Sequence, residues 1–408
     1  MPFRRRQFIG GVLSGFSAFA AGVGANPIAT AQQARESTVK RCVVLWMDGG
    51  PSQFETFDPK PDSSTGGDVG AIQTSVPGLD ISEFLPEMAK RMDQLSVVRN
   101  LSSMEGEHNR AQYLMHTGYP RIDTFPRPAL GAIAAHDVSV SNVPQYVSLG
   151  SRGFGPAFLG PQYGPFSIRD PESAREMLEV LRRRRSRVEF LRDLSANFSQ
   201  RYTDPAVQQR QAMIQQITHL ADSPFSRALD LERESRRRRA AYGNSHFSRL
   251  CLTARRLLET GVRFVEIQQD GWDSHTNNLS VTRRLCGRID QPWAVLMDEL
   301  SASGLLDDTV VLWMGEFGRT PDINGAAGRD HFPAVSPIVI GGAGLRSGQV
   351  IGATNESGRE IVGDSVGVPD LFATVLDRFG IEADHEFTTS FDSPTPATDS
   401  GTPIRGLL

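Results

Sequence analysis

Carboxylate and imidazole side chains follow several short apolar runs of this sequence. Such runs are typical of buried strands in a parallel sheet, and functional groups collect where those strands end because the loops there converge. Oxygen and nitrogen groups of this kind suit a divalent metal ion, for which zinc, manganese and calcium are the candidates. The pattern therefore predicts one metal pocket, and its expected ligands are Asp48, Asp273, His275, Glu316 and His331.

Three further residues are candidate catalytic residues beside that metal. Ser52 lies soon after Asp48, where a metal ion could lower the pKa of its hydroxyl, but it could also simply cap a turn. His108 could be a metal ligand, a general acid or a covalent phosphate acceptor. Arg319 could balance the carboxylates of the pocket. Water activated by the metal could also attack directly, and no side-chain nucleophile would then be needed.

The spacing of the expected ligands predicts how they meet. Asp273 and His275 are two residues apart, which suits a loop after a strand rather than one helix face. His331 precedes an apolar run, so it must return to the same sheet end through the loop 324–329, where glycines and alanines permit a sharp bend. We expect all of these side chains at one end of the sheet.

The elements that must position these residues alternate along the chain. The expected strands are Val43–Met47, Leu95–Arg99, Tyr146–Leu149, Val262–Ile267, Thr309–Met314 and Val335–Ile340. The expected helices include Phe84–Met92, Pro128–His136, Val295–Leu300 and Val368–Phe379. Strands that alternate with helices predict an α/β fold with helices on both faces of a sheet.

The domain organisation is predicted from where this alternation stops and resumes. Residues 40–170 and 261–383 are expected to form one α/β core. Residues 171–260 show helical periodicity instead, and we interpret them as a mainly helical insertion within that core. Residues 384–408 are rich in Ser, Thr, Pro and Asp and are expected to form a loose C-terminal tail.

Residues 1–31 have the features of an export signal. Arg5 and Arg6 are followed by Gln7, Phe8 and Ile9 and then by a weakly apolar run rich in Gly and Ala. The segment ends in a small-x-small cleavage site at residues 29–31. This twin-arginine pattern predicts the twin-arginine translocase as a partner and a periplasmic or extracellular protein without a stable membrane span after processing. The alternative is an uncleaved N-terminal membrane anchor.

Composition excludes several classes of protein. The 408 residues are 39% hydrophobic and 22% charged, which is typical of a globular protein and not of a disordered chain or a multi-span membrane protein. The formal net charge of -4 argues against a nucleic-acid partner. Three cysteines provide no disulfide framework. The arginine runs at residues 182–185 and 236–239 could bind an anionic partner, but nearby acids favour solvated helix faces.

Six motifs carry a resemblance to a known family. They follow the twin-arginine leader, extend over nearly the whole mature chain, and are Asp48–Gln53, Thr56–Pro61, Pro156–Pro161, Gly271–His275, Gly315–Thr320 and Gly328–His331. With these motifs the chain resembles the exported bacterial proteins of domain-of-unknown-function family 1501, which are abundant in planctomycetes. That family in turn resembles the alkaline phosphatase and sulfatase superfamily.

The resemblance implies a three-layer α/β/α sandwich that binds one or two divalent metals and hydrolyses phosphate or sulfate esters. By position, Asp48 resembles the first-strand metal aspartate of the superfamily. Asp273 and His275 resemble the Asp–His pair of one metal site, and His331 resembles the later histidine of that same site. Glu316 falls where the superfamily has an aspartate followed by a histidine.

Two departures from the superfamily pattern bear on the chemistry. The histidine expected after Glu316 is Phe317 here, which implies one metal rather than two. The cysteine that sulfatases modify has no counterpart, because His108, Asn109 and Arg110 occupy that region, and formylglycine chemistry is not expected.

Two functions are consistent with these features. The first is an exported metal-dependent hydrolase of phosphate or sulfate esters, whose substrate would be an anionic small molecule or a polysaccharide ester. The second is a non-catalytic exported binding or scaffold protein that keeps the superfamily fold. Metal content and activity on generic esters would distinguish them.

Overall fold

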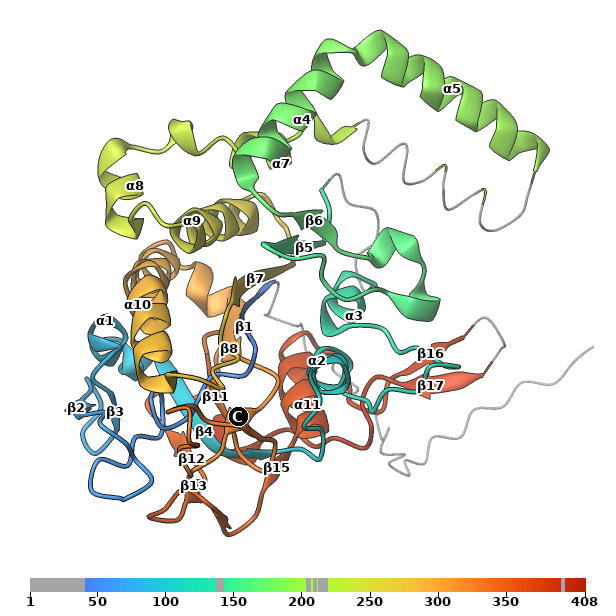
Figure 1. The fold of residues 1–408 in the computed structure, drawn as a ribbon. Helices are drawn as coiled ribbons and strands as arrows, with labels where there is room; N and C mark the ends of the chain where they lie inside the picture. The colour runs from blue at the N-terminus through green and yellow to red at the C-terminus, as the bar shows by residue number, and fades with distance from the viewer. Residues whose placement is uncertain (1–40, 137–142, 203–206, 208–210, 212–218, 390–392) are drawn as a thin grey trace, which may run out of the picture. The chain divides into compact units, whose positions relative to one another are not determined.

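The chain folds around one mixed β-sheet. The computed structural model describes residues 41–136, 143–202, 207, 211, 219–389 and 393–408 (Figure 1). Within them, nine strands form the sheet in the order β12-β4-β11-β8-β1-β7-β5-β6, with β15 paired to β4. These strands are β1 Arg41–Asp48, β4 Leu95–Ser102, β5 Tyr146–Leu149, β6 Phe166–Ile168, β7 Phe264–Asp270, β8 Thr309–Met314, β11 Ser336–Gly341, β12 Val350–Ile351 and β15 Val366–Gly367.

The centre of the sheet is buried on both faces. β1 pairs in parallel with β7 and β8, whereas β11 runs antiparallel to β4 and β8. Side chains alternate along β1, so Val43 and Leu45 join one core cluster while Val44 and Trp46 join the other. A strand buried on both faces requires the continuous apolar run from which it was predicted.

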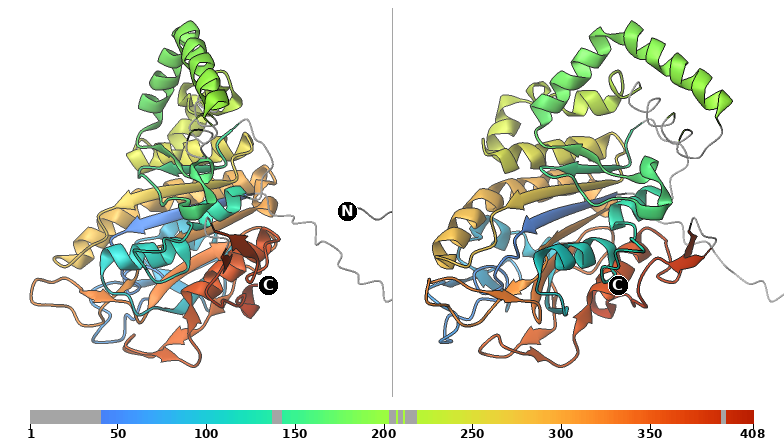
Figure 2. Two further views of the ribbon diagram at one scale, coloured as in Figure 1. Left: turned by 90° about the vertical axis from the view of Figure 1, so that its right-hand side faces the viewer. Right: turned by 45° about the vertical axis from the view of Figure 1, so that its right-hand side comes forward.

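Helices cover the two faces of this sheet (Figure 2). The helices that contribute to one core cluster include α1 Pro86–Ala89, α9 His246–Glu259 and α10 Asn278–Ala302. The opposite cluster holds residues of α2 His108–Thr117, α3 Leu130–His136 and α11 Val368–Arg378. The result is a three-layer α/β/α sandwich, which confirms the predicted fold class.

The segment 171–260 is helical where the structure describes it. Its helices are α4 Pro171–Arg183, α5 Arg185–Arg201, α7 Pro224–Ala228, α8 Arg236–Tyr242 and α9. α9 carries the predicted apolar stripe, with Phe247, Leu250 and Leu257 buried, and it packs against β7 and α10. The segment therefore supplies part of the core layer as well as peripheral helices.

Short elements complete the described chain. The two-stranded pairs are β2 Ala71–Gln73 with β3 Asp80–Ser82, β9 Gly318–Arg319 with β10 His331–Phe332, β13 Ala353–Thr354 with β14 Ile361–Val362, and β16 Glu386–Thr388 with β17 Pro394–Pro396. The 3-10 turns are η1 Met92–Gln94, η2 Ala157–Leu159, η3 Pro161–Tyr163, η4 Leu231–Arg233, η5 Leu305–Asp308 and η6 Arg405–Leu407.

The C-terminal segment differs from the loose tail predicted from its composition. It contains the β16–β17 pair, and the Ile404 amide donates to the Thr374 hydroxyl of α11 at 2.8 Å. Phe387 and Leu407 are buried in the core cluster of that face. A few apolar residues spaced among Ser, Thr and Pro are enough to fix the segment on the sandwich.

Most predicted elements are present, and the differences lie at their ends. β5 and β8 have the predicted bounds, while β7 begins and ends later than Val262–Ile267. The helix expected over Phe84–Met92 is shorter, because Pro86 begins it and the Asp290 carboxylate of α10 accepts its first free amides. Such capping by a distant residue leaves no local sequence signal.

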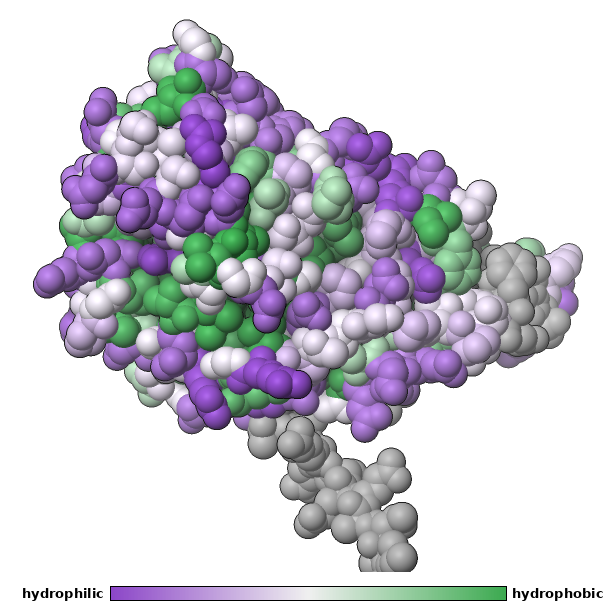
Figure 3. All heavy atoms as spheres, turned by 90° about the horizontal axis from the view of Figure 1, so that it is seen from below, coloured by the Kyte–Doolittle hydropathy of each residue, from purple (hydrophilic) through white to green (hydrophobic). Residues whose placement is uncertain are grey.

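Further observations concern the hydrophobic surface, membrane-spanning helices and the N-terminal segment. On the face shown in Figure 3, hydrophobic residues gather on one side, amid hydrophilic ones. In the described part of the chain, no helix has the length and apolar character needed to cross a bilayer. The predicted signal at residues 1–31 lies outside the described residues.

A buried ion-pair cluster in the helical segment gives a stability prediction. Burial raises the pKa of Glu234, but Arg238, Arg255 and Arg256 outweigh it and bring that pKa to about 2, below the ordinary 4.5. Its stabilising charge is complete above pH 4.5 and is lost as the pH falls toward 2. Glu234→Ala should lower the free energy of unfolding at pH 7 by about 3 kcal/mol.

Urea denaturation at pH 7 and pH 3 measures this difference. The gap between the wild type and Glu234→Ala should narrow at the lower pH. Glu232→Ala, which removes an exposed partner of Arg239, is the control and should change stability by less than about 0.5 kcal/mol. Equal effects of the two substitutions would contradict the prediction.

Candidate metal centre

Neighbouring strands deliver their following loops to one edge of the sheet. In the parallel register of β1 and β7, Asp48 lies opposite Asp270. The Trp272 amide donates to the Asp48 carbonyl at 3.0 Å, and the Gly49 amide donates to both carboxylate oxygens of Glu316 at 3.0 and 3.1 Å. The loops after β1, β7 and β8 therefore meet directly, as the strand-end pattern predicted.

Two glycines permit the closest approaches between these loops. Gly49 has a φ of +114°, and a Cβ there would lie 2.3 Å from the Asp273 nitrogen. A Cβ at Gly328 would lie 1.8 Å from the His275 carbonyl oxygen. Neither position has room for a side chain, so both glycines are needed for the loops to pack.

A short ribbon returns His331 to the same edge. β9 pairs antiparallel with β10, and in that register His331 lies opposite Arg319. Between the two strands, the Arg329 amide donates to the Ser274 carbonyl at 3.1 Å. The loop 324–329 thus makes the return that the position of His331 before an apolar run requires.

Helix α2, which follows β4 in the chain, brings His108 to this edge. Its N-cap is Glu107, whose carboxylate accepts the amides of Asn109 and Arg110 at 3.1 Å. His108 is the first residue of the helix, and Gln112 lies one turn later on the same face.

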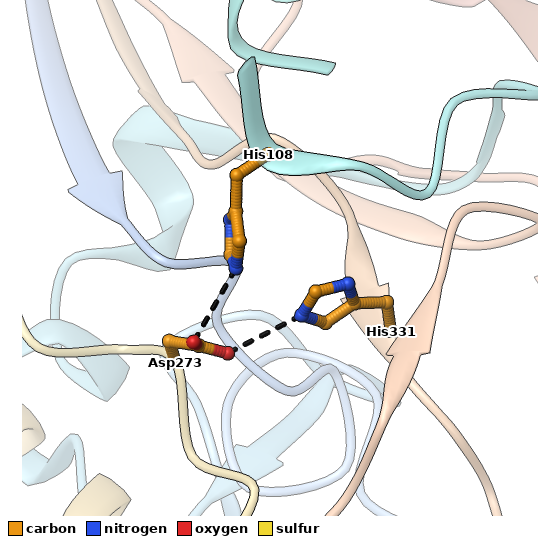
Figure 4. A group of neighbouring side chains, drawn as sticks. All are labelled: His108, Asp273 and His331. Carbon is orange, nitrogen blue, oxygen red and sulfur yellow. Dashed lines mark hydrogen bonds and ion pairs between the residues drawn. The ribbon is translucent and has the colours of Figure 1, made fainter. Parts of the chain in front are cut away.

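Three side chains from these elements point toward one another (Figure 4). His108 Nε2 lies 3.4 Å from Asp273 Oδ2, and His331 Nε2 lies 3.3 Å from Asp273 Oδ1. The candidate ligand atoms of these three residues all lie within 4.8 Å of one another. A fourth group joins them, because His275 Nε2 lies 2.9 Å from His331 Nε2 and 3.1 Å from Asp273 Oδ1. We call these four residues the metal group.

Each histidine of the metal group is held through its other ring nitrogen. The acceptors are Glu316 Oε1 at 2.8 Å from His108 Nδ1, Asp330 Oδ1 at 2.6 Å from His275 Nδ1, and the Gly106 carbonyl oxygen at 2.8 Å from His331 Nδ1. Because an ionised carboxylate or a carbonyl oxygen only accepts, each Nδ1 carries a proton, which leaves Nε2 as the atom of each ring that can offer a lone pair to a metal.

These lone pairs fit a cation. The Nε2 atoms of His275 and His331 face each other at 2.9 Å, where two lone pairs repel unless a positive charge lies between them. His108 Nε2 is buried and has no hydrogen-bond partner among the residues that the structure describes. Histidine ligands whose second nitrogen donates to a carboxylate or carbonyl are the usual arrangement around protein-bound metals.

Arg319 holds the carboxylate of the metal group. Burial raises the pKa of Asp273, but the hydrogen bond from Arg319 at 2.7 Å and its charge bring that pKa to about 2. Arg319 also donates to the carbonyls of Gly49, Gly50 and Arg329, and its side chain has no exposed surface. A fully buried guanidinium is placed to position Asp273 rather than to contact a substrate. The catalytic role of Arg319 stays a prediction.

The carboxylate oxygens of Glu316 accept hydrogen bonds from protein groups, whereas a metal ligand would direct an oxygen at the ion. Its side chain is fully buried, and its oxygens accept from the Gly49 amide, from His108 Nδ1 and from Gln112 Nε2. Gln112 also donates to Asp48 Oδ1 at 2.8 Å. Burial and the nearby Glu316 raise the pKa of Asp48, while the hydrogen bond to Glu316 raises that of His108.

An aromatic ring closes one side of the metal group. The Phe317 ring is fully buried, with its centroid 4.4 Å from that of His331 and 5.1 Å from that of His108. The sequence marked this position as the one where the superfamily has a histidine. The ring adds packing to both imidazoles but offers no ligand atom.

Behind the metal group, α2 is anchored by a buried histidine one turn beyond Gln112. His116 donates from Nδ1 to the Gln112 carbonyl at 2.7 Å, and its Nε2 lies 3.2 Å from Glu266 Oε2. Its ring lies between Trp46 and Phe154, with centroids 4.2 and 4.0 Å away. These contacts fix the position of α2 along the sheet.

Ser52 lies apart from these contacts. It is buried, its carbonyl accepts from the Thr56 hydroxyl, and its own Oγ has no hydrogen-bond partner among the residues described. No hydrogen bond therefore links Ser52 to the described metal group. Its role as a nucleophile stays a prediction.

The predicted site residues divide into two sets. Asp273, His275 and His331 come together with His108, which the sequence left open as a ligand, a general acid or a covalent phosphate acceptor. Asp48 and Glu316 are connected to this group through His108 and Gln112 rather than being part of it. The metal-binding roles of all these residues remain predictions.

Three residues that support the metal group, directly or through Glu316, were missed from the sequence. Gln112 follows His108 by four residues, but no helix was predicted over this segment, so nothing placed the two side chains on one face. Asp330 stands beside His331 but bonds to His275 across the group. The contact of His331 with the Gly106 carbonyl could not be predicted, because every residue has a backbone carbonyl and the sequence does not mark which one is used.

The chain belongs to a family of proteins without an established activity. The family model described as "Protein of unknown function (DUF1501)" matches residues 39–408. This confirms the family to which the six motifs pointed. No curated protein matches the sequence.

Several solved structures are similar to this chain. One is the lipoteichoic acid synthase LtaP from Listeria monocytogenes, with 9% identity and a TM-score of 0.42 over 91% of this chain and 76% of that one. Another is the PsFucS1 sulfatase from Pseudoalteromonas sp., with 12% identity and a TM-score of 0.40 over 85% and 68% of the two chains. A third is a TAB5 alkaline phosphatase mutant, with 12% identity and a TM-score of 0.36 over 77% and 94%.

Removing a member of the metal group should weaken metal binding. His331→Ala deletes a nitrogen donor and Asp273→Ala deletes the anionic oxygen, so each should lower zinc affinity by about 100-fold or more. Competition with a chromophoric chelator measures the affinity. His246→Ala, which removes an exposed histidine of α9, is the control and should bind zinc like the wild type. Unchanged affinity in both Asp273→Ala and His331→Ala would show that the group does not hold the metal.

Proposed function

We propose that this protein is a metal-dependent hydrolase of phosphate or sulfate esters. The observation that carries the proposal is the metal group, in which three Nε2 atoms surround one anionic carboxylate and every Nδ1 is tied to an acceptor. A donor set rich in nitrogen favours zinc or manganese over calcium, which prefers oxygen ligands. The buried Phe317 ring beside two of the histidines supports one metal rather than two.

A divalent cation in such a group can polarise an ester oxygen and activate water. The residues around it are arranged for that chemistry. Glu316 holds the His108 ring through Nδ1, which directs Nε2 toward Asp273. The side chains of Asp273 and His275 are 44% and 41% exposed, so a substrate can reach the metal group from solvent.

Asp48 supports a proton-transfer role near this group. Its raised pKa favours the protonated form relative to an ordinary aspartate. Its Oδ1 accepts from Trp46 and Gln112, while Oδ2 has no hydrogen bond to any residue the structure describes. A carboxyl with one oxygen fixed and one available can give a proton to a leaving oxygen.

The alternative function is binding without catalysis. It is supported by the contacts of Arg319, whose guanidinium donates to Asp273 and to backbone carbonyls. This guanidinium is therefore not available to bind the phosphate or sulfate group of a substrate. In that case the metal would hold an anionic ligand, and no bond would break.

A substrate panel tests the proposal. The purified protein should contain about one metal per chain and hydrolyse at least one of p-nitrophenyl phosphate, bis-p-nitrophenyl phosphate and p-nitrophenyl sulfate. A chelator should abolish turnover, zinc or manganese should restore it, and Asp273→Asn should lower kcat/KM by at least about 100-fold. A metal-loaded, folded protein that turns over none of the three esters would favour the binding function.

Ser52→Ala distinguishes attack by the Ser52 hydroxyl from attack by water activated by the metal. Because its hydroxyl makes no described contact with the metal group, we expect kcat/KM to stay within about threefold of the wild type. A loss of about 1,000-fold or more with metal content unchanged would instead identify Ser52 as the nucleophile.

We also propose export by the twin-arginine route to the periplasm or beyond, on the strength of the leader sequence. Replacing Arg5 and Arg6 together by Lys should retain the protein in the cytoplasm with its leader uncleaved. Cell fractionation with an antibody against the mature chain measures this, and Arg35→Lys, outside the leader, is the control. Normal export of the double variant would refute the assignment.

A further inference from the structure

A cavity in the helical segment is unusually rich in arginine. It has a volume of about 360 Å³ and is lined by residues of α4, α7 and η4, of which α4 and α7 are labelled in Figure 1. Its lining residues are Arg175, Leu178, Glu179, Arg182, Arg183, Ala221, Ser226, Arg227, Asp230 and Arg233. Five of these ten residues are arginines and two are acids, so the cavity carries an excess of positive charge.

The acids do not compensate this charge. Glu179 accepts from both Arg182 and Arg183, so one carboxylate serves two guanidinium groups. Arg175, Arg227 and Arg233 form no ion pair with any acid in the part of the chain that the structure describes. Arginine cannot lose its proton at any physiological pH, so the repulsion cannot be relieved by titration. A concave surface lined by one sign of charge concentrates ions of the other sign.

This cavity shares Arg182 and Arg183 with one of the arginine runs noted in the sequence. Elsewhere in the two runs, Arg185 pairs with Glu189 and Arg239 with Glu232, as solvated helix faces with compensating acids should. In the cavity, by contrast, arginines of α4 line the same space as arginines of α7 and η4. The sequence could not reveal this, because residues 184–223 separate α4 from α7 and η4.

We propose that this cavity binds a phosphate or sulfate group carried by an anionic ligand. Planar guanidinium groups bind such oxyanions through two parallel hydrogen bonds, and several of them around one space can surround a tetrahedral anion. The volume exceeds that of a single oxyanion and has room for the sugar or other unit that carries it. None of the elements that line the cavity contributes to the metal group, so the inference stands independently of the proposed hydrolase activity.

Calorimetric titration of the full chain tests the proposal, with inorganic phosphate, inorganic sulfate and dextran sulfate as separate probes. The ionic strength is kept near 0.15 M, since weak surface attraction is largely screened there. The triple variant Arg175→Gln/Arg227→Gln/Arg233→Gln should bind at least tenfold more weakly than the wild type. Comparable affinity per anionic group for all probes would identify a free oxyanion as the ligand, and tighter binding of dextran sulfate a polymer.

A second triple variant is the matched control. Arg237→Gln/Arg284→Gln/Arg288→Gln removes the same charge from exposed arginines outside the cavity and should bind like the wild type. Because the metal group is intact in every protein compared, any anion it binds contributes equally. Equal weakening in both triple variants, or no binding of any probe by the wild type, would overturn the proposal.

Hydrogen–deuterium exchange locates the probe without relying on the triple variant. Dextran sulfate should protect the backbone of residues 171–183 and 224–233 in the wild type. If the triple variant does not fold, the exposed single variant Arg227→Gln should show weaker protection of these segments. Protection confined to other segments would place the anion elsewhere and refute the assignment.

Discussion

The buried guanidinium of Arg319 is the contact on which the site depends. It has no exposed surface and donates to the carbonyls of Gly49 and Gly50 after β1, to Asp273 after β7, and to the Arg329 carbonyl before β10. One side chain therefore ties together three loops that neighbouring strands bring to the sheet edge. A cation so buried is tolerated only because a carboxylate and fixed carbonyl dipoles replace its hydration, and each of these acceptors would be left unpaired without it.

Around that contact, the carboxylates have separate tasks. Asp273 is kept anionic by Arg319 and faces the histidines, whereas Glu316 is buried and orients His108. Asp273 and Glu316 were both predicted as metal ligands from the sequence. In the structure Asp273 is a candidate ligand, whereas Glu316 orients the candidate ligand His108. The difference comes from solvent access, since only the exposed carboxylate has an oxygen directed at the space a metal would occupy.

The fold could be predicted further than the site. Continuous apolar runs such as Thr309–Met314 are a local signal, and burial on both faces of a sheet explains them. The glycines and alanines of the loop 324–329 allowed the return of His331 to be predicted, and the strand-end rule collected Asp273 and His275. It could not foresee that Glu316 turns to His108, a residue 208 positions away, because that depends on packing between loops. The prediction of a loose C-terminal tail was wrong because it rested on the content of Ser, Thr, Pro and Asp. Composition does not show where apolar residues such as Phe387 and Leu407 stand among them.

Helix α2 links the metal group to the interior of the protein. His108, Gln112 and His116 stand one turn apart along it. His108 lies against Asp273 of the metal group, Gln112 donates to Asp48 and Glu316, and His116 lies against Glu266 of β7. The helix rises only 5.4 Å per turn, so a slide of a fraction of that distance would move every one of these contacts together. The packing of His116 against its aromatic neighbours therefore determines where His108, a candidate ligand two turns away, lies relative to Asp273. A substitution at position 116 would move that candidate ligand without being part of the metal group.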